Sequence, residues 1–309
     1  MIIACGEALI DMLPRTSTLG EPAFAPHAGG SVFNTAVALG RLGARAGFFS
    51  GISTDMLGAI LTQRLEEAGV DHALCARSAR PTTLALVELR DGQASYAFYD
   101  ENTAGRMLTT ADLPPAREDG GAGHAWFFGG ISLVAEPCGT AYEALQARES
   151  ANAVTMLDPN IRPGFIRDEA GHRARILRMT ARADIVKVSD EDLHWIMGPG
   201  DPAALARALG DLGPALVCVT EGARGVRAFA RGTETRVAAP QVAVVDTVGA
   251  GDTFNAGLLA ALDGAGLLNR PALAALESGA LAEALALGTR AAAITVSRAG
   301  ANPPWRAEL

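Results

Sequence analysis

Residues 244–257, VVDTVGAGDTFNAG, contain the pattern from which both the fold and the chemistry can be inferred. A β-branched run breaks at Gly249-Ala250-Gly251, and Asp252 follows at the start of a pattern that predicts a helix. The free N–H groups and the positive dipole end of a helix start can hold an anion. Glycines let such a backbone approach a phosphoryl group closely.

Asp252 has two interpretations at this position. The amides could hold a transferring phosphoryl group while Asp252 takes the proton of an attacking hydroxyl. Alternatively, Asp252 is a simple helix N-cap and the glycines serve a tight turn. The segment alone leaves both interpretations open.

Other nucleotide and metal motifs do not fit the sequence. A Walker A loop needs Gly-Lys-Ser/Thr, but the only lysine, Lys187, follows Val186. The dinucleotide fingerprint fails because Phe254 stands where a third glycine is needed. The five histidines are scattered and form no HExxH motif, which argues against a metal cluster.

Composition narrows the class of protein. The 309 residues carry a formal net charge of -8, which argues against a nucleic-acid surface. The four cysteines lie far apart and mostly in apolar runs, as in reduced core residues. The first residues, MIIACGEALIDML, lack a basic region and are too short to span a bilayer. We therefore expect a cytoplasmic protein that neither inserts in a membrane nor is secreted.

Apolar runs alternate with helical patterns along most of the chain, with helices expected over 32–42, 56–68, 138–150 and 170–182. This alternation predicts a doubly wound, mostly parallel sheet covered by helices on both faces, in a single α/β domain over 1–309. A hairpin after Gly225 should extend its far edge. The tail from Arg270 to Arg298 should be helical, with breaks at Gly279 and Gly288.

Two segments should form a small separate sheet that acts as a lid. Residues 82–104 contain two β-rich runs around Asp91-Gly92, a hairpin signal, and residues 12–28 are rich in turn residues. Such flaps often cover sites. Because Leu84, Leu86 and Phe98 would give this sheet an apolar face, we expect a homodimer formed through the lid.

The residues from Asp246 to Phe254, DTVGAGDTF, match every fixed position of the D-T-x-G-A-G-D-x-F signature, so the chain resembles the ribokinase-like, or PfkB, carbohydrate kinases and within them fructokinases. Further matches run in order from Gly6 to Pro304. The resemblance implies a ribokinase-like fold and ATP as phosphoryl donor. It also implies that Asp252 is the catalytic base and that the amides of Gly249, Ala250 and Gly251 form an anion hole.

The resemblance also implies a set of sugar ligands. Gly29-Gly30 with Asn34 match the family's N-terminal motif, although Val32 and Phe33 replace its small residues or proline. Asp11, at the end of the first apolar run, matches an acidic residue that binds sugar hydroxyls, and Asp158-Pro159-Asn160-Ile161-Arg162 resembles the fructokinase D-P-N-x-R segment. The expected substrate ligands are Asp11, Gly29, Gly30, Asn34, Tyr96, Phe98, Arg106, Asn160 and Arg162.

The nucleotide side is expected around three further segments. Lys187 and Ser189 lie in a segment like K-x-S-x-E-E, Thr220, Gly222 and Gly225 in one like T-L-G-x-x-G-V, and Asn302 in the closing loop. As a point charge at a strand end, Lys187 can reach phosphate. Magnesium should be held mainly by phosphates and water. Whether Asp246 helps to bind K⁺ is left open.

The leading hypothesis is phosphorylation of a sugar hydroxyl, and the resemblance to fructokinases favours fructose as the sugar. Within the class, a 2-keto-3-deoxygluconate kinase would use Arg162 or Arg106 to bind the substrate carboxylate. A nucleoside kinase ranks third, because aromatic residues on the hairpin could face a base. From other classes, a non-catalytic sugar-binding relative and a NAD-dependent oxidoreductase rank lower.

Overall fold

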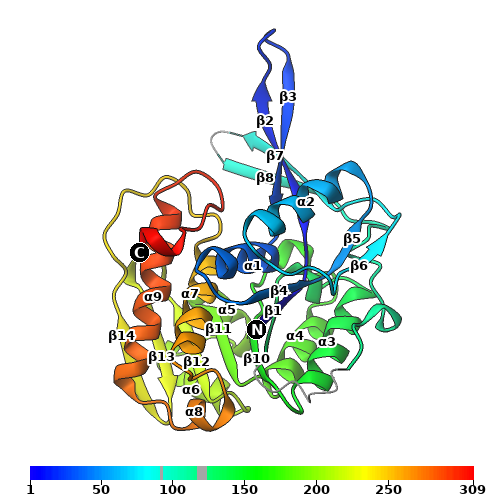
Figure 1. The fold of residues 1–309 in the computed structure, drawn as a ribbon. Coiled ribbons are helices and arrows are strands. Elements are labelled where there is room, and N and C mark those ends of the chain that lie inside the picture. Colours follow the sequence, from blue (N-terminus) through cyan, green and yellow to red (C-terminus); the bar gives the residue numbers. More distant parts are fainter. Residues whose placement is uncertain (91–92, 117–123) are drawn as a thin grey trace.

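The computed structural model describes residues 1–90, 93–116 and 124–309, apart from the side chains of residues 87–96. An eight-stranded sheet forms the centre of the molecule (Figure 1). Its strands are β1 (Ile2–Cys5), β4 (Ala46–Phe49), β9 (Ala125–Gly129), β10 (Val154–Asp158), β11 (Ile185–Ser189), β12 (Leu216–Thr220), β13 (Val226–Ala230) and β14 (Thr233–Val237).

The strand order is β14-β13-β12-β11-β10-β9-β1-β4. All pairs from β4 to β12 are parallel, whereas β13 and β14 add an antiparallel hairpin at one edge. The mostly parallel sheet is therefore confirmed, and so is the edge hairpin after Gly225. Since the parallel strands end at one edge of the sheet, their carboxyl ends bring distant segments together there.

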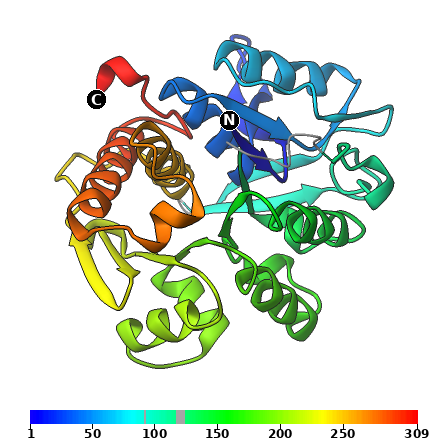
Figure 2. The ribbon, with the colours of Figure 1, turned by 60° about the horizontal axis from the view of Figure 1, so that its bottom comes forward.

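Helices cover both faces of this sheet, as the strand–helix alternation predicts. They are α1 (Ser31–Arg41), α2 (Met56–Glu67), α3 (Cys138–Glu149), α4 (Glu169–Thr180), α5 (Asp190–Met197), α6 (Pro202–Gly210), α7 (Ala250–Gly264), α8 (Arg270–Ala274) and α9 (Ser278–Val296), with short 3-10 turns η1 (Thr110–Asp112), η2 (Ile131–Leu133), η3 (Pro163–Phe165), η4 (Gly222–Arg224) and η5 (Arg306–Glu308). In Figure 2 the green α3 and α4 lie well apart from the orange-brown α7 and α9.

Successive residues of a strand point to opposite faces, and β1 shows how this divides the core. Ile2 and Ala4 pack with α1, α7 and α9, whereas Ile3 and Cys5 pack with α3 to α6. All four cysteines are buried free thiols, as their apolar surroundings predict. The sheet therefore has a complete core on each side.

A second sheet has the order β3-β2-β7-β8, with strands β2 (Leu9–Thr16), β3 (Pro22–Gly29), β7 (Leu84–Arg90) and β8 (Gln93–Tyr99). The β2–β3 hairpin projects from the body of the molecule (Figure 1). A short parallel pair, β5 (Gly51–Ser53) and β6 (Ala76–Ser78), completes the strands of the described residues.

The first apolar run does not form one strand that ends at Asp11, as the sequence analysis expects. It divides at residues 6–8 into β1 and β2, which belong to different sheets, and Asp11 lies inside β2. Gly6 permits this crossing because a Cβ there would lie 2.5 Å from Val32 Cγ2. A run that is buried throughout carries no alternation to mark such a change of sheet.

The predicted breaks at Gly279 and Gly288 are wrong. Both glycines lie inside α9, and the chain interrupts its helix at residues 275–277 instead. Gly288 is needed for packing, because a Cβ there would lie 2.9 Å from Phe254 Cδ2 on α7. By length and composition α9 could cross a membrane, but Leu281, Ala284 and Leu285 are buried in the core. Its apolar character is thus accounted for by packing on α7.

Candidate active site

Two cavities lie at the carboxyl ends of the parallel strands. One, the polar cavity, measures about 400 Å³ and is lined by residues from β2, the starts of α1 and α7, and the loop after β10. The other, the apolar groove, measures about 450 Å³ and runs along α7, α9 and residues 239–244. Thr247, Ala250 and Gly251 line both, so the two cavities meet at the Gly-Ala-Gly turn.

Asp252 lies on the first turn of α7 but does not cap it. The N-cap is Gly249, at φ 78°, a left-handed conformation that favours glycine. The carboxylate of Asp252 instead accepts hydrogen bonds from Ser31 Oγ at 2.7 Å and Asn34 Nδ2 at 3.0 Å, both on α1. The N-cap interpretation is therefore wrong, and Asp252 faces the polar cavity.

Burial raises the pKa of Asp252 to about 6. The hydrogen bonds from Ser31 and Asn34 oppose this rise, and the nearby carboxylate of Asp158 adds to it. At pH 7 the group is mostly ionised yet close to its pKa. This is the range in which a carboxylate can accept a proton efficiently.

A buried ion pair lies behind the Gly-Ala-Gly turn. Lys187 Nζ is 2.9 Å from Asp158 Oδ2, and the same oxygen accepts a hydrogen bond from Asn255 Nδ2 at 2.7 Å. A Cβ on Gly251 would lie 3.1 Å from Lys187 Nζ, so the ammonium group is next to the turn. Burial opposes the charge of Lys187, but Asp158 and Asp192 outweigh it and raise its pKa.

The N–H groups of the turn are only partly occupied. Ala250 N–H donates to Thr247 O at 3.3 Å, a long bond. For Gly249 and Gly251, no acceptor is found among the described residues. Donors that lack a partner at a helix start suit an anion.

On the other side of the polar cavity, the structure brings together several of the predicted sugar ligands. Asp11 projects from β2, and its burial raises its pKa to about 6. A Cβ on Gly29 would lie 2.2 Å from Asp11 Oδ2, which accounts for the glycine. Gly30, at φ 108°, and Asn34 also line the cavity.

The segment after β10 also lines the polar cavity. Asn160 adopts φ 45° and donates through Nδ2 to Ser31 Oγ at 2.7 Å. Arg162 lines the cavity beside it. Phe98 packs edge-on against Phe165, with ring centroids 4.4 Å apart, and both rings face the cavity.

Other predicted residues lie away from the cavity. Arg106 pairs with Asp100 at 2.9 Å and is not among the lining residues, and the side chain of Tyr96 lies outside the described residues. Val32 and Phe33 are buried in the core, where Phe33 packs edge-on against Phe48. Neither of these two departures from the family motif lines the polar cavity.

Of the predicted nucleotide ligands, Lys187 lines the polar cavity, and the others divide into two groups. Thr220, Gly222 and Gly225 line the apolar groove. Ser189 caps α5 by accepting from Asp192 N at 2.9 Å, and Asn302 accepts from Arg41 Nη1 at 2.7 Å. Neither of these two lines the groove.

Asp246 connects two loops that flank the groove. Its carboxylate accepts from Val248 N at 3.0 Å and from Gly300 N at 2.9 Å. The loop before α7 is thereby fixed to the loop after α9. In the structure, Asp246 thus acts as a backbone acceptor at both loops.

Several residues of the site were missed by the sequence analysis: Glu7, Ser31, Phe165 and Asn255, together with the valines of the apolar groove, Val242, Val244 and Val296. Ser31 could have been found, because it directly follows the Gly-Gly pair at the predicted start of a helix. The others carry no local signal, since only the fold brings them to the cavities.

The whole chain matches a known family. A family model described as pfkB family carbohydrate kinase matches residues 1–308. The chain belongs to the pfkB family of carbohydrate kinases. It is therefore a phosphotransferase with an alcohol acceptor, and the predicted family, fold and enzyme class are confirmed.

Similar proteins of the pfkB family include fructokinases. The chain is 56% identical over 281 residues to a fructokinase of Rhizobium leguminosarum bv. trifolii, covering 91% of this chain and 85% of that protein. A crystal structure of Xylella fastidiosa fructokinase with bound ATP has a TM-score of 0.88 at 27% identity, covering 97% and 93% of the two chains.

A crystal structure of Vibrio cholerae O395 fructokinase in fructose, ADP and calcium ion bound form has a TM-score of 0.84 at 25% identity, covering 97% of this chain and 94% of that one. This chain is thus a fructokinase-like sugar kinase of the pfkB family.

Proposed function

We propose that the protein transfers the γ-phosphoryl group of ATP to a hydroxyl of fructose. The observation that carries this proposal is the position of Asp252, where the polar cavity and the apolar groove meet. The 56% identity to a fructokinase supports fructose as the acceptor. Related fructokinases with bound ATP, or with fructose and ADP, support the two ligands.

In this proposal Asp252 is the general base. The sugar hydroxyl oxygen attacks the γ-phosphorus, the bond to the bridging oxygen of ADP breaks, and the hydroxyl proton passes to Asp252. Ser31 and Asn34 orient the carboxylate through their bonds to its two oxygens. Below pH 6 the carboxylate is protonated and cannot accept the proton, because its pKa is about 6.

The negative charge of the transferring group would be held at the Gly-Ala-Gly turn. The N–H groups of Gly249, Ala250 and Gly251 and the dipole of α7 supply fixed positive potential there. Lys187 lies directly behind the turn and adds a positive charge that Asp158 keeps in place.

Mg²⁺ fits this cavity as an ion that arrives with ATP. Among the described residues no group of three His, Cys, Asp or Glu gathers, so phosphates and waters would hold most of its coordination sites. When bound, it would neutralise developing phosphoryl charge. Whether K⁺ activates the enzyme through Asp246 is decided by comparing its activity in K⁺ and Na⁺.

The remaining ligands divide between the two cavities. Asp11, Gly30, Asn34, Asn160 and Arg162 would bind sugar hydroxyls, with Phe98 against the carbon face of the ring. Thr220, Gly222 and Gly225 would border the nucleotide in the apolar groove. For Gly29, Ser189 and Asn302 we propose an indirect role, since each shapes a neighbour instead of lining a cavity.

The second sheet is proposed to act as the lid and to mediate a homodimer. Leu84 is half-buried against the main core and Phe98 contacts Phe165, so part of the apolar face is already covered within the chain. On the projecting hairpin, Leu19 and Phe24 remain exposed, at 83% and 49%. Light scattering of the protein and of a Phe24→Ser variant tests the dimer.

The decisive experiment measures ADP release from Mg·ATP with fructose, 2-keto-3-deoxygluconate, ribose and adenosine. We expect saturable turnover with fructose, and a fall of at least roughly 10²-fold in Asp252→Ala. Retention of most activity in Asp252→Ala would overturn the assignment of the base.

A second acceptor, 2-keto-3-deoxygluconate, is favoured by one observation. The Arg162 side chain lines the polar cavity and could bind a carboxylate. If this acid gave the higher kcat/KM, the enzyme class would stand and fructose would be replaced as substrate.

A further inference from the structure

Glu7 is a buried acid that the proposed mechanism does not use. It lies between β1 and β2, is 9% exposed and lines the polar cavity. Burial raises its pKa. None of the ion pairs formed within residues 1–90, 93–116 and 124–309 includes Glu7. An uncompensated acid in such a place is costly to bury unless its hydrogen bonds matter.

The two oxygens of Glu7 accept from two separate helix starts. Oε1 accepts from Ser31 N at 3.0 Å, and Oε2 accepts from Ser132 N at 3.2 Å. The N-cap residues of these helices are Gly30 and Gly130, which have no side chain with which to cap. Glu7 therefore supplies the capping oxygens that both glycines lack.

Both glycines are also required by the approach of Glu7. Gly130, at φ 71°, would place a Cβ 2.1 Å from Glu7 Oε1. Gly30, at φ 108°, would place one 2.9 Å from Glu7 O. The backbone of both turns is thus shaped to let Glu7 lie between them.

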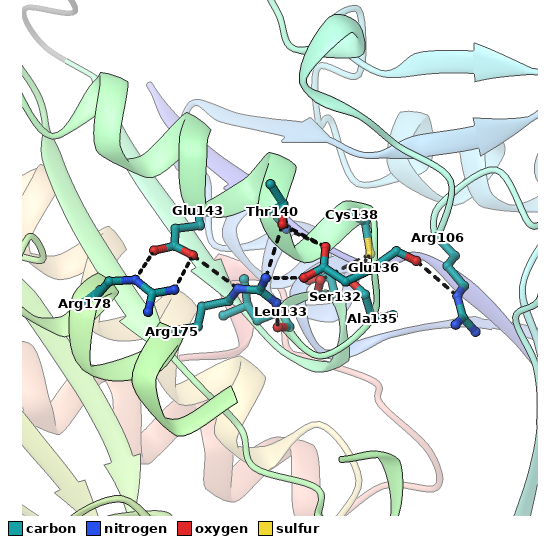
Figure 3. Close-up of polar contacts among 10 residues, drawn as sticks. All are labelled: Arg106, Ser132, Leu133, Ala135, Glu136, Cys138, Thr140, Glu143, Arg175 and Arg178. Carbon is teal, nitrogen blue, oxygen red and sulfur yellow. Dashed lines mark hydrogen bonds and ion pairs between the residues drawn. The ribbon is translucent and has the colours of Figure 1, made fainter. Parts of the chain in front are cut away.

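Contacts other than those to Glu7 also hold the η2 turn, and Figure 3 shows them. Arg175 Nη1 donates to Leu133 O at 2.9 Å, and Cys138 Sγ donates to Ser132 O at 3.3 Å. Arg175 is itself held by Glu136 and Glu143. The turn can therefore serve as a fixed support, to which Glu7 attaches the start of α1.

The start of α1 carries both groups that hold Asp252, namely the Ser31 hydroxyl and the Asn34 amide. We propose that Glu7 is a positioning residue for Asp252, because it fixes the first turn of α1 against the η2 turn. This inference rests on the proposed role of Asp252 as base. Glu7 acts through Ser31 and needs no contact with the reacting atoms.

Glutamine cannot replace Glu7 in this role. Two backbone N–H groups require two acceptor oxygens, whereas glutamine offers one oxygen and one NH₂ donor. In either orientation its NH₂ would face the N–H of Ser31 or of Ser132. Glu7→Gln therefore keeps the size of the side chain and leaves one buried donor unpaired.

The test compares Glu7→Gln, Ser31→Ala and the double variant. We expect Glu7→Gln to lower kcat roughly 10- to 100-fold, as for a small displacement of a catalytic group, with the KM for ATP little changed. The acid limb of kcat, measured at saturating fructose, should move to higher pH, because Asp252 loses hydrogen bonds that lower its pKa. The other charged groups near Asp252, namely Asp158 and Lys187 beside it and Asp11 and Arg162 in the same cavity, are unaltered.

Since part of the effect of Glu7 passes through the Ser31 hydroxyl, the double variant should lose less activity than the two single losses multiplied together. Asp184→Asn is the matched control. Asp184 also accepts from a backbone N–H, that of Thr155 at 2.9 Å, and it pairs with Arg270 as well. It directly precedes β11, at the amino ends of the parallel strands and so at the far end of the sheet from Asp252. This variant should keep the wild-type acid limb.

An unshifted acid limb in folded Glu7→Gln, or additive losses in the double variant, would overturn the proposal. If Glu7→Gln does not fold by circular dichroism, Glu7→Asp takes its place, since its shorter carboxylate should shift the acid limb in the same direction. Asp252→Ala is measured in parallel. Activity in that variant would contradict the proposed base, whereas an inactive Asp252→Ala beside an unshifted Glu7 variant would overturn this inference alone.

Discussion

Replacing Gly288 with alanine tests how closely α7 and α9 approach. A Cβ on Gly288 would lie 2.9 Å from Phe254 Cδ2 and 3.0 Å from Phe254 O. Such overpacking costs about 1–3 kcal/mol. The helical preference of alanine over glycine offsets roughly 0.5–1 kcal/mol of this. The difference between these two ranges centres on a loss of roughly 1.3 kcal/mol of unfolding free energy in Gly288→Ala, which for 309 residues is roughly 2 °C in Tm.

The matched control is Gly279→Ala on the same helix. Gly279 is exposed, and no described atom lies within 4 Å of a Cβ built there. This variant should keep the wild-type stability or gain up to about 1 kcal/mol of unfolding free energy, so its Tm should stay the same or rise slightly. Differential scanning calorimetry measures both.

The Gly288→Ala variant should also lower kcat, because Phe254 lies two residues after Asp252 on α7. An unchanged or raised Tm in Gly288→Ala would refute the argument, since it would show that the helices separate without cost.

Three other perturbations follow from the buried charges. Lys187→Met leaves Asp158, which is 1% exposed, without its counter-charge. The free energy of unfolding, measured in urea, should fall by about 3–5 kcal/mol, and adding Asp158→Asn should recover part of this loss. His172 is buried with a pKa lowered to about 4, mainly by burial, so the unfolded chain binds more protons between pH 4 and 6.5 and stability falls as pH drops through this window. His172→Phe should therefore show a smaller difference in Tm between pH 7.5 and pH 5, and an equal difference would contradict this. Asp11→Ala should raise the KM for fructose roughly 10- to 100-fold and leave the KM for ATP unchanged. In the wild type, the KM for fructose should rise below pH 6 as Asp11 becomes protonated. Parallel changes in both KM values would argue against a contact between Asp11 and the sugar.

The fold could be predicted wherever a local pattern carries it. Alternating strands and helices indicate the parallel sheet, and Asp91-Gly92 indicates a hairpin. The division of the first apolar run between two sheets could not be predicted, because all residues from Ile2 to Ile10 are buried and show no alternation. The helix break predicted at Gly288 is wrong for a related reason. The glycine is needed there because α9 packs closely against Phe254, which is distant in the sequence.

The sequence predicts the site residues that lie within one motif, but it does not predict which residues from different motifs contact each other. Asp252 and its turn are marked by adjacent residues, but the partner of Asp252, Ser31, is 221 positions away in the chain. The contact between Glu7 and Ser132 spans 125 positions. No spacing rule relates such residues, so only the packed strands and helices reveal that they form one network.

The single lysine gives the surface an unusual chemistry. Lys187 is 5% exposed and paired with Asp158, so every basic side chain that solvent can reach easily is an arginine or a histidine. An amine-reactive label or cross-linker therefore meets no accessible lysine amine, and lysine acetylation has no accessible target. Guanidinium groups also stay charged at alkaline pH where ammonium groups begin to lose their protons. The positive part of the surface charge should thus stay nearly constant from neutral pH to about pH 11.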